Sequence, residues 1–116
     1  MKSTKDVINN HLRCFDEGNL EGILDDYSAN AVLFTTEGPL KGRTEIKPLF
    51  EALLAEFGKP GASFKPLRES FVGDYAYLVW SAETADNVYE LATDTFVVRD
   101  GKKEVQSFAA KTSPKH

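Results

Sequence analysis

Apolar residues recur with helical spacing in three segments of the N-terminal half. The apolar positions of these segments, in chain order, are Val7, Ile8, Leu12 and Phe15; Leu20, Ile23, Leu24 and Tyr27; and Ile46, Leu49, Phe50, Leu53, Leu54 and Phe57. Spacings of three and four residues place each set on one face of an α-helix. Ser3 and Asp6 form a capping-box pattern before the first helix, and Gly18 is typical of its end. We therefore predict three helices, of which the second is short and carries Tyr27.

Capping residues mark the starts of the second and third helices. Asn19 precedes the second helix and Thr44 the third, and each has a side-chain oxygen that can accept a hydrogen bond from a free backbone N–H. Pro48 then falls in the first turn of the third helix, where its missing N–H costs little. Gly58 ends that helix.

The rest of the chain has the β-branched, aromatic and alternating pattern of strands. Strands are predicted at residues 31–36, 63–71, 75–84, 88–99 and 103–112. Asp100-Gly101 between the last two is typical of a tight hairpin, because such a turn needs positive φ at its central residues. Helices followed by a strand meander predict one α+β domain, residues 1–116, with the helices packed on one face of an antiparallel sheet.

The strand predicted at 75–84 is apolar on both faces. Tyr75, Tyr77 and Val79 alternate there with Ala76, Leu78 and Trp80. A sheet that helices cover on one side is expected to be polar on the other. Because a large apolar patch marks an interaction site, we predict that a second copy covers the outer face and forms a homodimer. Trp80 is interpreted as a packing or dimer-interface residue, with stacking on a ligand as the alternative.

Composition and charge exclude several classes of function. The formal net charge is −4, and the chain lacks the basic stripe that nucleic-acid binding requires. No run of about 18 apolar residues is present, so no membrane span is predicted. The single cysteine, Cys14, cannot form an internal disulfide, which favours a cytoplasmic protein. Two histidines and one cysteine make no metal-ligand cluster, and no glycine-rich phosphate loop precedes a helix, so we expect neither metal nor cofactor.

Three segments of the chain resemble a known superfamily. They are residues 15–34 (FDEGNLEGILDDYSANAVLF), 38–50 (GPLKGRTEIKPLF) and 93–102 (TDTFVVRDGK). In this order they resemble the nuclear transport factor 2-like superfamily, and within it the ketosteroid isomerase and polyketide cyclase-like (SnoaL-like) group. The resemblance implies a cone-shaped α+β fold, with three N-terminal helices packed on a strongly curved antiparallel sheet. It implies no single activity, because this scaffold hosts isomerases, dehydratases, hydrolases, cyclases and non-catalytic modules.

The resemblance also implies roles for three positions. Asp94 matches the aspartate that ketosteroid isomerases keep protonated so that it can donate a hydrogen bond. His11 stands where those enzymes have a tyrosine, and Thr35 where they have the carboxylate base. Because Thr35 carries no carboxylate, ketosteroid isomerisation is not predicted. His11 and Asp94 are the candidate catalytic residues; the alternatives are a core histidine bonded to backbone and an exposed or hydrogen-bonded strand aspartate.

Five further residues are candidates for the wall of a pocket: Tyr27, Thr35, Val79, Glu83 and Phe96. Phe96 shares strand parity with Asp94, and Glu83 shares it with Val79. The alternatives are a core tyrosine for Tyr27 and a solvated strand end for Glu83.

Three hypotheses about function remain open on the sequence. The first is a small-molecule-binding protein with a ketosteroid isomerase-like pocket for a mostly apolar ligand with a polar head. The second is a cofactor-independent isomerase, dehydratase or hydrolase, in which His11 and Asp94 polarise an oxygen and exchange a proton. The third is a non-catalytic dimerisation module. The pocket hypotheses require that His11 and Asp94 meet in a cavity.

Overall fold

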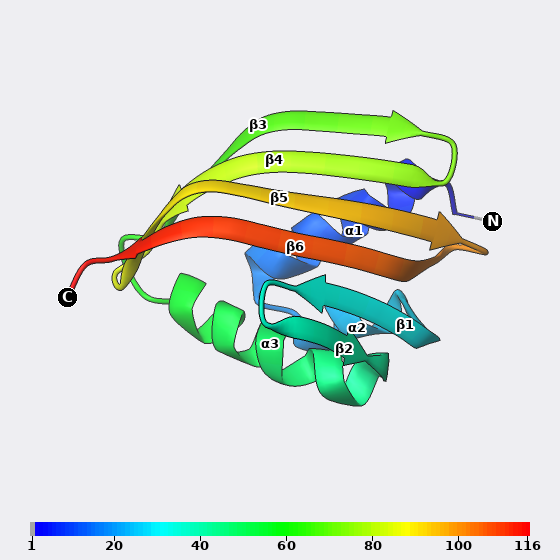
Figure 1. Cartoon of the computed structure of the whole chain (residues 1–116), viewed down its shortest axis with the longest axis horizontal. Coiled ribbons are helices and arrows are strands. Elements are labelled where there is room, and N and C mark those ends of the chain that lie inside the picture. Colours follow the sequence, from blue (N-terminus) through cyan, green and yellow to red (C-terminus); the bar gives the residue numbers. More distant parts are fainter. Residues whose placement is uncertain (1) are drawn as a thin grey trace.

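The computed structural model describes residues 2–116, which form three helices and one curved six-stranded sheet (Figure 1). The elements in chain order are α1 (Thr4–Glu17), α2 (Leu20–Asp25), β1 (Tyr27–Thr35), β2 (Gly38–Lys41), α3 (Gly42–Phe57), β3 (Ser63–Val72), β4 (Tyr75–Glu83), β5 (Asn87–Arg99) and β6 (Lys102–Pro114). The strand order is β2-β1-β6-β5-β4-β3. All neighbouring strands are antiparallel except β1 and β6, which run parallel. The α+β fold expected from the sequence is confirmed, with this parallel pair as its departure from an antiparallel sheet.

The start and end of α1 follow from its capping residues. Ser3 accepts a hydrogen bond from the backbone N–H of Asp6, and the Asp6 side chain accepts one from the backbone of Ser3. Gly18 ends the helix in the left-handed conformation, with φ at 71°, which glycine adopts without steric cost. Asn19 caps α2 through the N–H of Gly22. These caps confirm the prediction for both helices.

Two boundaries near the third helix differ from the prediction. Helix α3 begins at Gly42 rather than after Thr44, because a φ of 75° at Gly42 turns the chain directly out of β2. Pro48 therefore lies inside the helix and not in its first turn. Tyr27 is the first residue of β1 and not part of α2, since α2 already ends at Asp25.

The last two strands are joined by the predicted tight hairpin. Asp100 and Gly101 both have positive φ, at 53° and 73°, and Arg99 pairs with Lys102. A two-residue loop of this kind fixes which residues of β5 and β6 face each other. The hairpin thereby sets the starting register of the two strands that carry most of the polar site described below.

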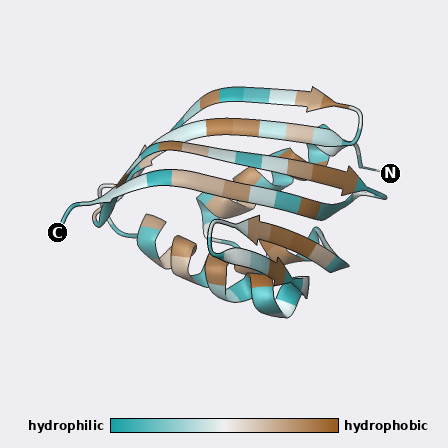
Figure 2. Cartoon of the chain, viewed as in Figure 1, coloured by the Kyte–Doolittle hydropathy of each residue, from teal (hydrophilic) through white to brown (hydrophobic). Residues whose placement is uncertain are grey.

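The core lies between the helices and the inner face of the sheet. One cluster of buried side chains joins α1, α2 and α3 to β1, and a second joins α1 to β4 and β5. In β5 the buried residues alternate as Ala92, Asp94, Phe96 and Val98. Figure 2 shows that apolar and polar residues also alternate along α3. Within residues 2–116, no helix is long and apolar enough to cross a membrane.

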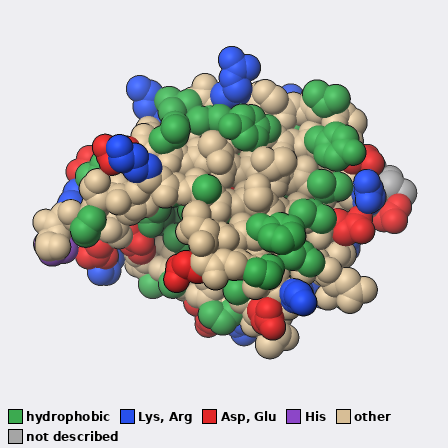
Figure 3. Space-filling model, in the orientation of Figure 1, with side chains coloured by type: hydrophobic (Ala, Val, Ile, Leu, Met, Phe, Trp, Pro, Cys, Tyr) green, Lys and Arg blue, Asp and Glu red, His purple; other side chains and the backbone are tan. Residues whose placement is uncertain are grey.

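The outer face of the sheet is left uncovered by the chain's own helices. Tyr75 is 53% exposed and Val72 is 73% exposed, and they pair with each other at the β3–β4 end of the sheet. Tyr77 and Leu91 are also exposed. Figure 3 shows hydrophobic side chains in separate patches over this view of the molecule. Tyr75 and Tyr77, two of the apolar residues predicted on the outer face of β4, are therefore exposed there.

Candidate functional site

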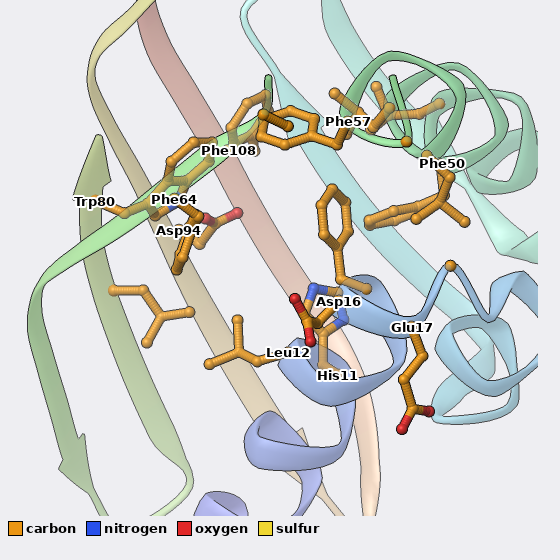
Figure 4. A pocket seen from close by; sticks show the side chains of 18 of the residues that line it. His11, Leu12, Asp16, Glu17, Phe50, Phe57, Phe64, Trp80, Asp94 and Phe108 are labelled. Carbon is orange, nitrogen blue, oxygen red and sulfur yellow. The ribbon is translucent and has the colours of Figure 1, made fainter. Parts of the chain in front are cut away.

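A cavity of about 420 Å³ lies between the inner face of the sheet and helices α1 and α3. Its wall is mostly apolar and aromatic, with residues that include Leu12, Phe15, Leu49, Phe50, Leu53, Phe57, Phe64, Leu78, Trp80 and Phe108. Three polar side chains also line it well inside the fold: His11, Asp94 and Gln106. Figure 4 shows His11 and Leu12 on the helix side and Trp80 and Asp94 on the strand side. A concave, largely apolar space with a few polar groups is typical of a small-molecule site.

His11 lies on the buried face of α1, where only 6% of its surface is exposed. Its ring meets Phe50 and Phe96 edge-on, with centroids 5.6 Å and 5.4 Å away. Nδ1 of His11 lies 2.7 Å from Nζ of Lys103. Burial, and then the positive charge of Lys103, hold the pKa of His11 well below its ordinary 6.5. The imidazole is therefore neutral at neutral pH.

Asp94 lies on the inner face of β5 and is 8% exposed. One carboxylate oxygen accepts a hydrogen bond from Nε1 of Trp80 at 2.8 Å, and the other accepts one from Nε2 of Gln106 at 2.9 Å. Burial raises the pKa of Asp94 to about 6, although both hydrogen bonds act in the opposite direction. At neutral pH the group is an ionised acceptor, because its pKa lies below 7 and each oxygen already faces an N–H donor.

Tyr27 holds Gln106 from behind the cavity. Its buried hydroxyl donates to Oε1 of Gln106, which leaves Nε2 of the same amide to donate to Asp94. Burial, and then the negative charge of Asp94, raise the pKa of Tyr27 well above its ordinary 10, so the hydroxyl remains a donor. Tyr27 therefore orients the amide that serves Asp94 and does not itself line the cavity.

Trp80 forms an aromatic wall beside Asp94. It stacks on Phe108 with an interplanar angle of 10° and a centroid distance of 6.1 Å, and its ring centroid lies 5.3 Å from that of Phe64. The packing expected of Trp80 is confirmed, but the side chain lies on the inner face of β4 with Leu78 and not on the outer face expected of a dimer residue.

Four of the expected pocket residues lie elsewhere, in addition to Tyr27. Phe96 is fully buried in the core under His11. Thr35 accepts a hydrogen bond within the β1–β2 turn from the N–H of Glu37, and it does not line this cavity. Val79 pairs with Thr93 on the outer face, and Glu83 is exposed. The error for Val79 and Glu83 comes from strand parity: on β4 the buried positions are the even-numbered ones.

His11 and Asp94 both line the cavity, His11 from the helix side and Asp94 from the strand side, and their hydrogen bonds go to different residues. His11 pairs with Lys103, and Asp94 pairs with Trp80 and Gln106. Lys103 and Gln106 were not predicted from the sequence, although both are polar residues inside the strand predicted at 103–112. Within residues 2–116, no group of three or more His, Cys, Asp or Glu side chains could hold a metal ion.

Residues 8–104 match the SnoaL-like domain. The chain belongs to the SnoaL-like domain family. No protein among the curated sequences matches it. The match spans α1 to the start of β6, so it includes His11, Trp80, Asp94 and Lys103. Gln106 and Phe108 lie just beyond it.

Several solved structures share this SnoaL-like fold at low sequence identity. SalBIII, an epoxide hydrolase/cyclase-like enzyme of pyran ring formation in the polyether salinomycin, is 16% identical over 96% of this chain and 95% of its own, with a TM-score of 0.80. A proposed ketosteroid isomerase from Kribbella flavida is 12% identical over 93% and 77%, with a TM-score of 0.75. A proposed polyketide cyclase from Sinorhizobium meliloti is 17% identical over 89% and 93%, with a TM-score of 0.70. Identities this low show a shared fold and leave the activity to be argued from the site.

Proposed function

We propose that this SnoaL-like domain binds a small, mostly apolar molecule with an oxygen-bearing polar head. The observation that carries the proposal is the cavity of about 420 Å³, whose mostly apolar wall includes neutral His11 on the helix side and ionised Asp94, bonded to Gln106, on the strand side. Burial of apolar surface would supply most of the affinity, at about 25 cal/mol per Å². His11 and Asp94 would orient the head of the ligand, because Gln106, the other buried polar side chain of the wall, is already bonded to Tyr27 and Asp94.

The structure supports a different role for Asp94 from the one implied by the resemblance. In ketosteroid isomerases the matching aspartate is a neutral acid, whereas Asp94 faces two N–H donors and has a pKa of about 6. We propose that Asp94 accepts a hydrogen bond or a proton from the ligand. His11 would then contact the ligand's oxygen.

A second candidate function is proton transfer beside a carbonyl group. A carboxylate with a pKa of about 6 in an apolar cavity has the basicity that such a step needs near neutral pH. The C–H bond next to the carbonyl would break, its proton would pass to Asp94, and the electron pair would form the enolate. The proton would return from Asp94 to the same carbon or to a conjugated one, so that no cofactor takes part. His11 would stabilise the enolate oxygen.

Trp80 offers a direct test of binding, because it is the only tryptophan and lines the cavity. The probe is 2-tetralone, an apolar bicyclic ketone with acidic C–H groups, and the control is tetralin, which has the same rings without the oxygen. We expect 2-tetralone to change the Trp80 emission with saturation and to bind about tenfold more tightly than tetralin, as one additional hydrogen bond predicts. Unchanged Trp80 emission up to the solubility limit of the ketone would contradict the binding proposal.

The same ketone tests catalysis. In deuterium oxide, an enolising protein exchanges the C–H protons of 2-tetralone for deuterium faster than buffer does, and mass spectrometry follows the exchange. We expect Asp94→Asn to lose the acceleration while it still binds the ketone. A wild-type rate equal to that of buffer, together with saturable binding, would leave the domain a binding protein only.

We also propose that a second copy of the chain covers the outer face of the sheet. The exposed apolar residues of that face, Val72, Tyr75, Tyr77 and Leu91, support this partner. Light scattering at tens of micromolar should give twice the chain mass of 12.9 kDa. Tyr77→Glu places a charge on the outer face and should give the mass of a single chain. Glu69→Gln is the control: Glu69 pairs with buried Leu78, so its side chain lies on the inner face, and this variant should keep the double mass. A wild-type chain of single mass would refute the dimer.

A further inference from the structure

A fully buried lysine lies directly behind the cavity. Lys103 is 0% exposed, and it is absent from the cavity wall. Its strand position pairs it with Tyr27 of β1 and Val98 of β5, so its side chain points into the core between the sheet and helices α1 and α2. Lysine is among the residues that are almost never fully buried without a partner. The proposed function does not account for it.

The neighbours of the Lys103 amine are three electron-rich groups. Nζ lies 2.7 Å from Nδ1 of His11, 3.1 Å from the backbone oxygen of Ile23, and 3.9 Å from the centre of the Tyr27 ring. An ammonium group has three N–H donors and no acceptor, which matches this environment one to one. Burial lowers the pKa of Lys103 to about 7, and the nearby carboxylate of Asp26 acts in the opposite direction and favours the charged amine.

The second ring nitrogen of His11, Nε2, has no hydrogen-bond partner among residues 2–116. Among residues 2–116, the only side-chain nitrogen or oxygen that is both fully buried and without a hydrogen-bond partner is Oγ of Ser28. Nε2 of His11 has no hydrogen bond to these residues, so it must be accessible. Since His11 lines the cavity and its Nδ1 is turned toward Lys103, we infer that Nε2 faces the cavity.

We propose that Lys103 is a positioning residue that donates to Nδ1 of His11 and thereby fixes the tautomer whose Nε2–H faces the ligand. A neutral imidazole carries one proton, so a donor at Nδ1 requires the proton to be on Nε2. The cavity then presents one donor, at His11, and one acceptor, at Asp94. The ligand class is a molecule with an acceptor oxygen, such as a carbonyl, near His11 and a donor or acidic C–H near Asp94. This last point rests on the proposed function; the tautomer does not.

The tautomer can be read directly by nitrogen NMR of the full chain labelled at histidine. The chain has two histidines, and His116→Gln leaves His11 as the only one. At about pH 6.5 His11 is neutral and Lys103, whose pKa burial lowers to about 7, is still mostly charged. We expect the spectrum of a neutral Nε2–H imidazole. A neutral Nδ1–H imidazole would overturn the proposal, and this measurement needs no variant of Lys103.

Two matched substitutions test whether Lys103 is the cause. Lys103→Met removes the amine and keeps an unbranched apolar chain, whereas Lys102→Met makes the same change at the neighbouring residue, whose amine binds the exposed backbone oxygen of Asp25. We expect Lys103→Met to give a mixture of His11 tautomers and Lys102→Met to give the Nε2–H form alone. A folded Lys103→Met that keeps only the Nε2–H form would overturn the proposal.

Binding separates this inference from the proposed function. Lys103→Met should weaken 2-tetralone about two- to tenfold and leave tetralin unchanged, because only the ketone has an oxygen to meet Nε2–H. If 2-tetralone does not bind the wild-type chain, the proposed function fails while the tautomer result stands. If the ketone binds and His11 carries its proton on Nδ1, the positioning role of Lys103 fails alone.

Discussion

Replacement of Asp94 by Asn should change the pH dependence of stability in a defined direction. Burial raises the pKa of Asp94 from 3.8 to about 6 in the folded chain. The folded state therefore holds its proton more tightly than the unfolded state does. The stability that this proton contributes is fully present below about pH 3.8 and is lost as the pH rises through about 6. One pKa unit corresponds to about 1.4 kcal/mol, so the change across this window is about 3 kcal/mol.

Asn cannot titrate, and it can keep the hydrogen bonds. Its oxygen can accept from Trp80, and its amide can donate to Gln106 once the Gln106 amide turns over. We expect the free energy of unfolding of Asp94→Asn, relative to wild type, to rise by about 2 kcal/mol between pH 4 and pH 7, which is most of the full change. Urea denaturation of both chains at four pH values in this range measures it. Asp100→Asn, in the exposed β5–β6 turn, removes a carboxylate elsewhere and serves as the control.

A constant difference between Asp94→Asn and wild type would refute the reasoning. A variant that loses stability relative to wild type as the pH rises would refute it more strongly. That result would mean that the hydrogen bonds from Trp80 and Gln106 outweigh the burial of the charge, and that Asp94 is held as a paired structural carboxylate. The proton-accepting role proposed for Asp94 would then fail.

Two further substitutions test hydrogen bonds of α1 and α3, the two helices that line the cavity. His11→Phe keeps an aromatic ring but removes the nitrogen that accepts from Lys103. Urea denaturation should therefore show a free energy of unfolding about 1–3 kcal/mol lower than that of wild type. Glu56→Ala, at the end of α3, should cost a similar amount at pH 7, because the carboxylate accepts three side-chain hydrogen bonds that tie α3 to the β4–β5 turn. Burial acts to raise the pKa of Glu56, but these hydrogen bonds outweigh it and lower the pKa below 4.5. The stability that these hydrogen bonds contribute should therefore be lost as the pH falls below about 4.5. For either variant, a urea denaturation midpoint equal to that of wild type would contradict its prediction.

Local signals in the sequence were sufficient for most of the fold. The capping box at Ser3, the left-handed Gly18 and the Asp100-Gly101 turn each depend on neighbours within four residues, so they can be read without the tertiary structure. The same holds for the apolar face of α3. Thr44 failed as a predicted cap because Gly42, which tolerates positive φ, offered the chain an earlier turn into the helix.

The site could be predicted only in part, because irregularities in the strands decide which side chains face the cavity. The Asp100-Gly101 hairpin alone would pair Asp94 with Ser107, but a bulge between Val97 and Val98 shifts the register by one residue. Asp94 therefore pairs with Phe108, and Gln106 and Phe108 turn inward. A one-residue shift exchanges the two faces of a strand, and no local pattern in the sequence marks this bulge.

The ionisation state of Asp94 could not be predicted from the sequence, for a related reason. Its burial follows from strand parity with Phe96 and Val98, so a raised pKa was expected. The donors that keep the carboxylate ionised at neutral pH come from two other strands, Trp80 on β4 and Gln106 on β6. Their meeting at Asp94 depends on the register of three strands, which the sequence does not specify residue by residue.

His11 and Asp94 are each held by partners within the protein, whether or not a ligand is bound. His11 is held by Lys103 from behind the wall, and Asp94 by Trp80 and Gln106 beside it. A polar group fixed in this way loses little freedom when a ligand arrives, which favours binding of a molecule whose own donor and acceptor match. A ligand of opposite polarity would place an acceptor against the carboxylate and a donor against an N–H, and each mismatch leaves a buried group unpaired. The domain should therefore discriminate among apolar molecules of equal size by the order of donor and acceptor along their polar edge.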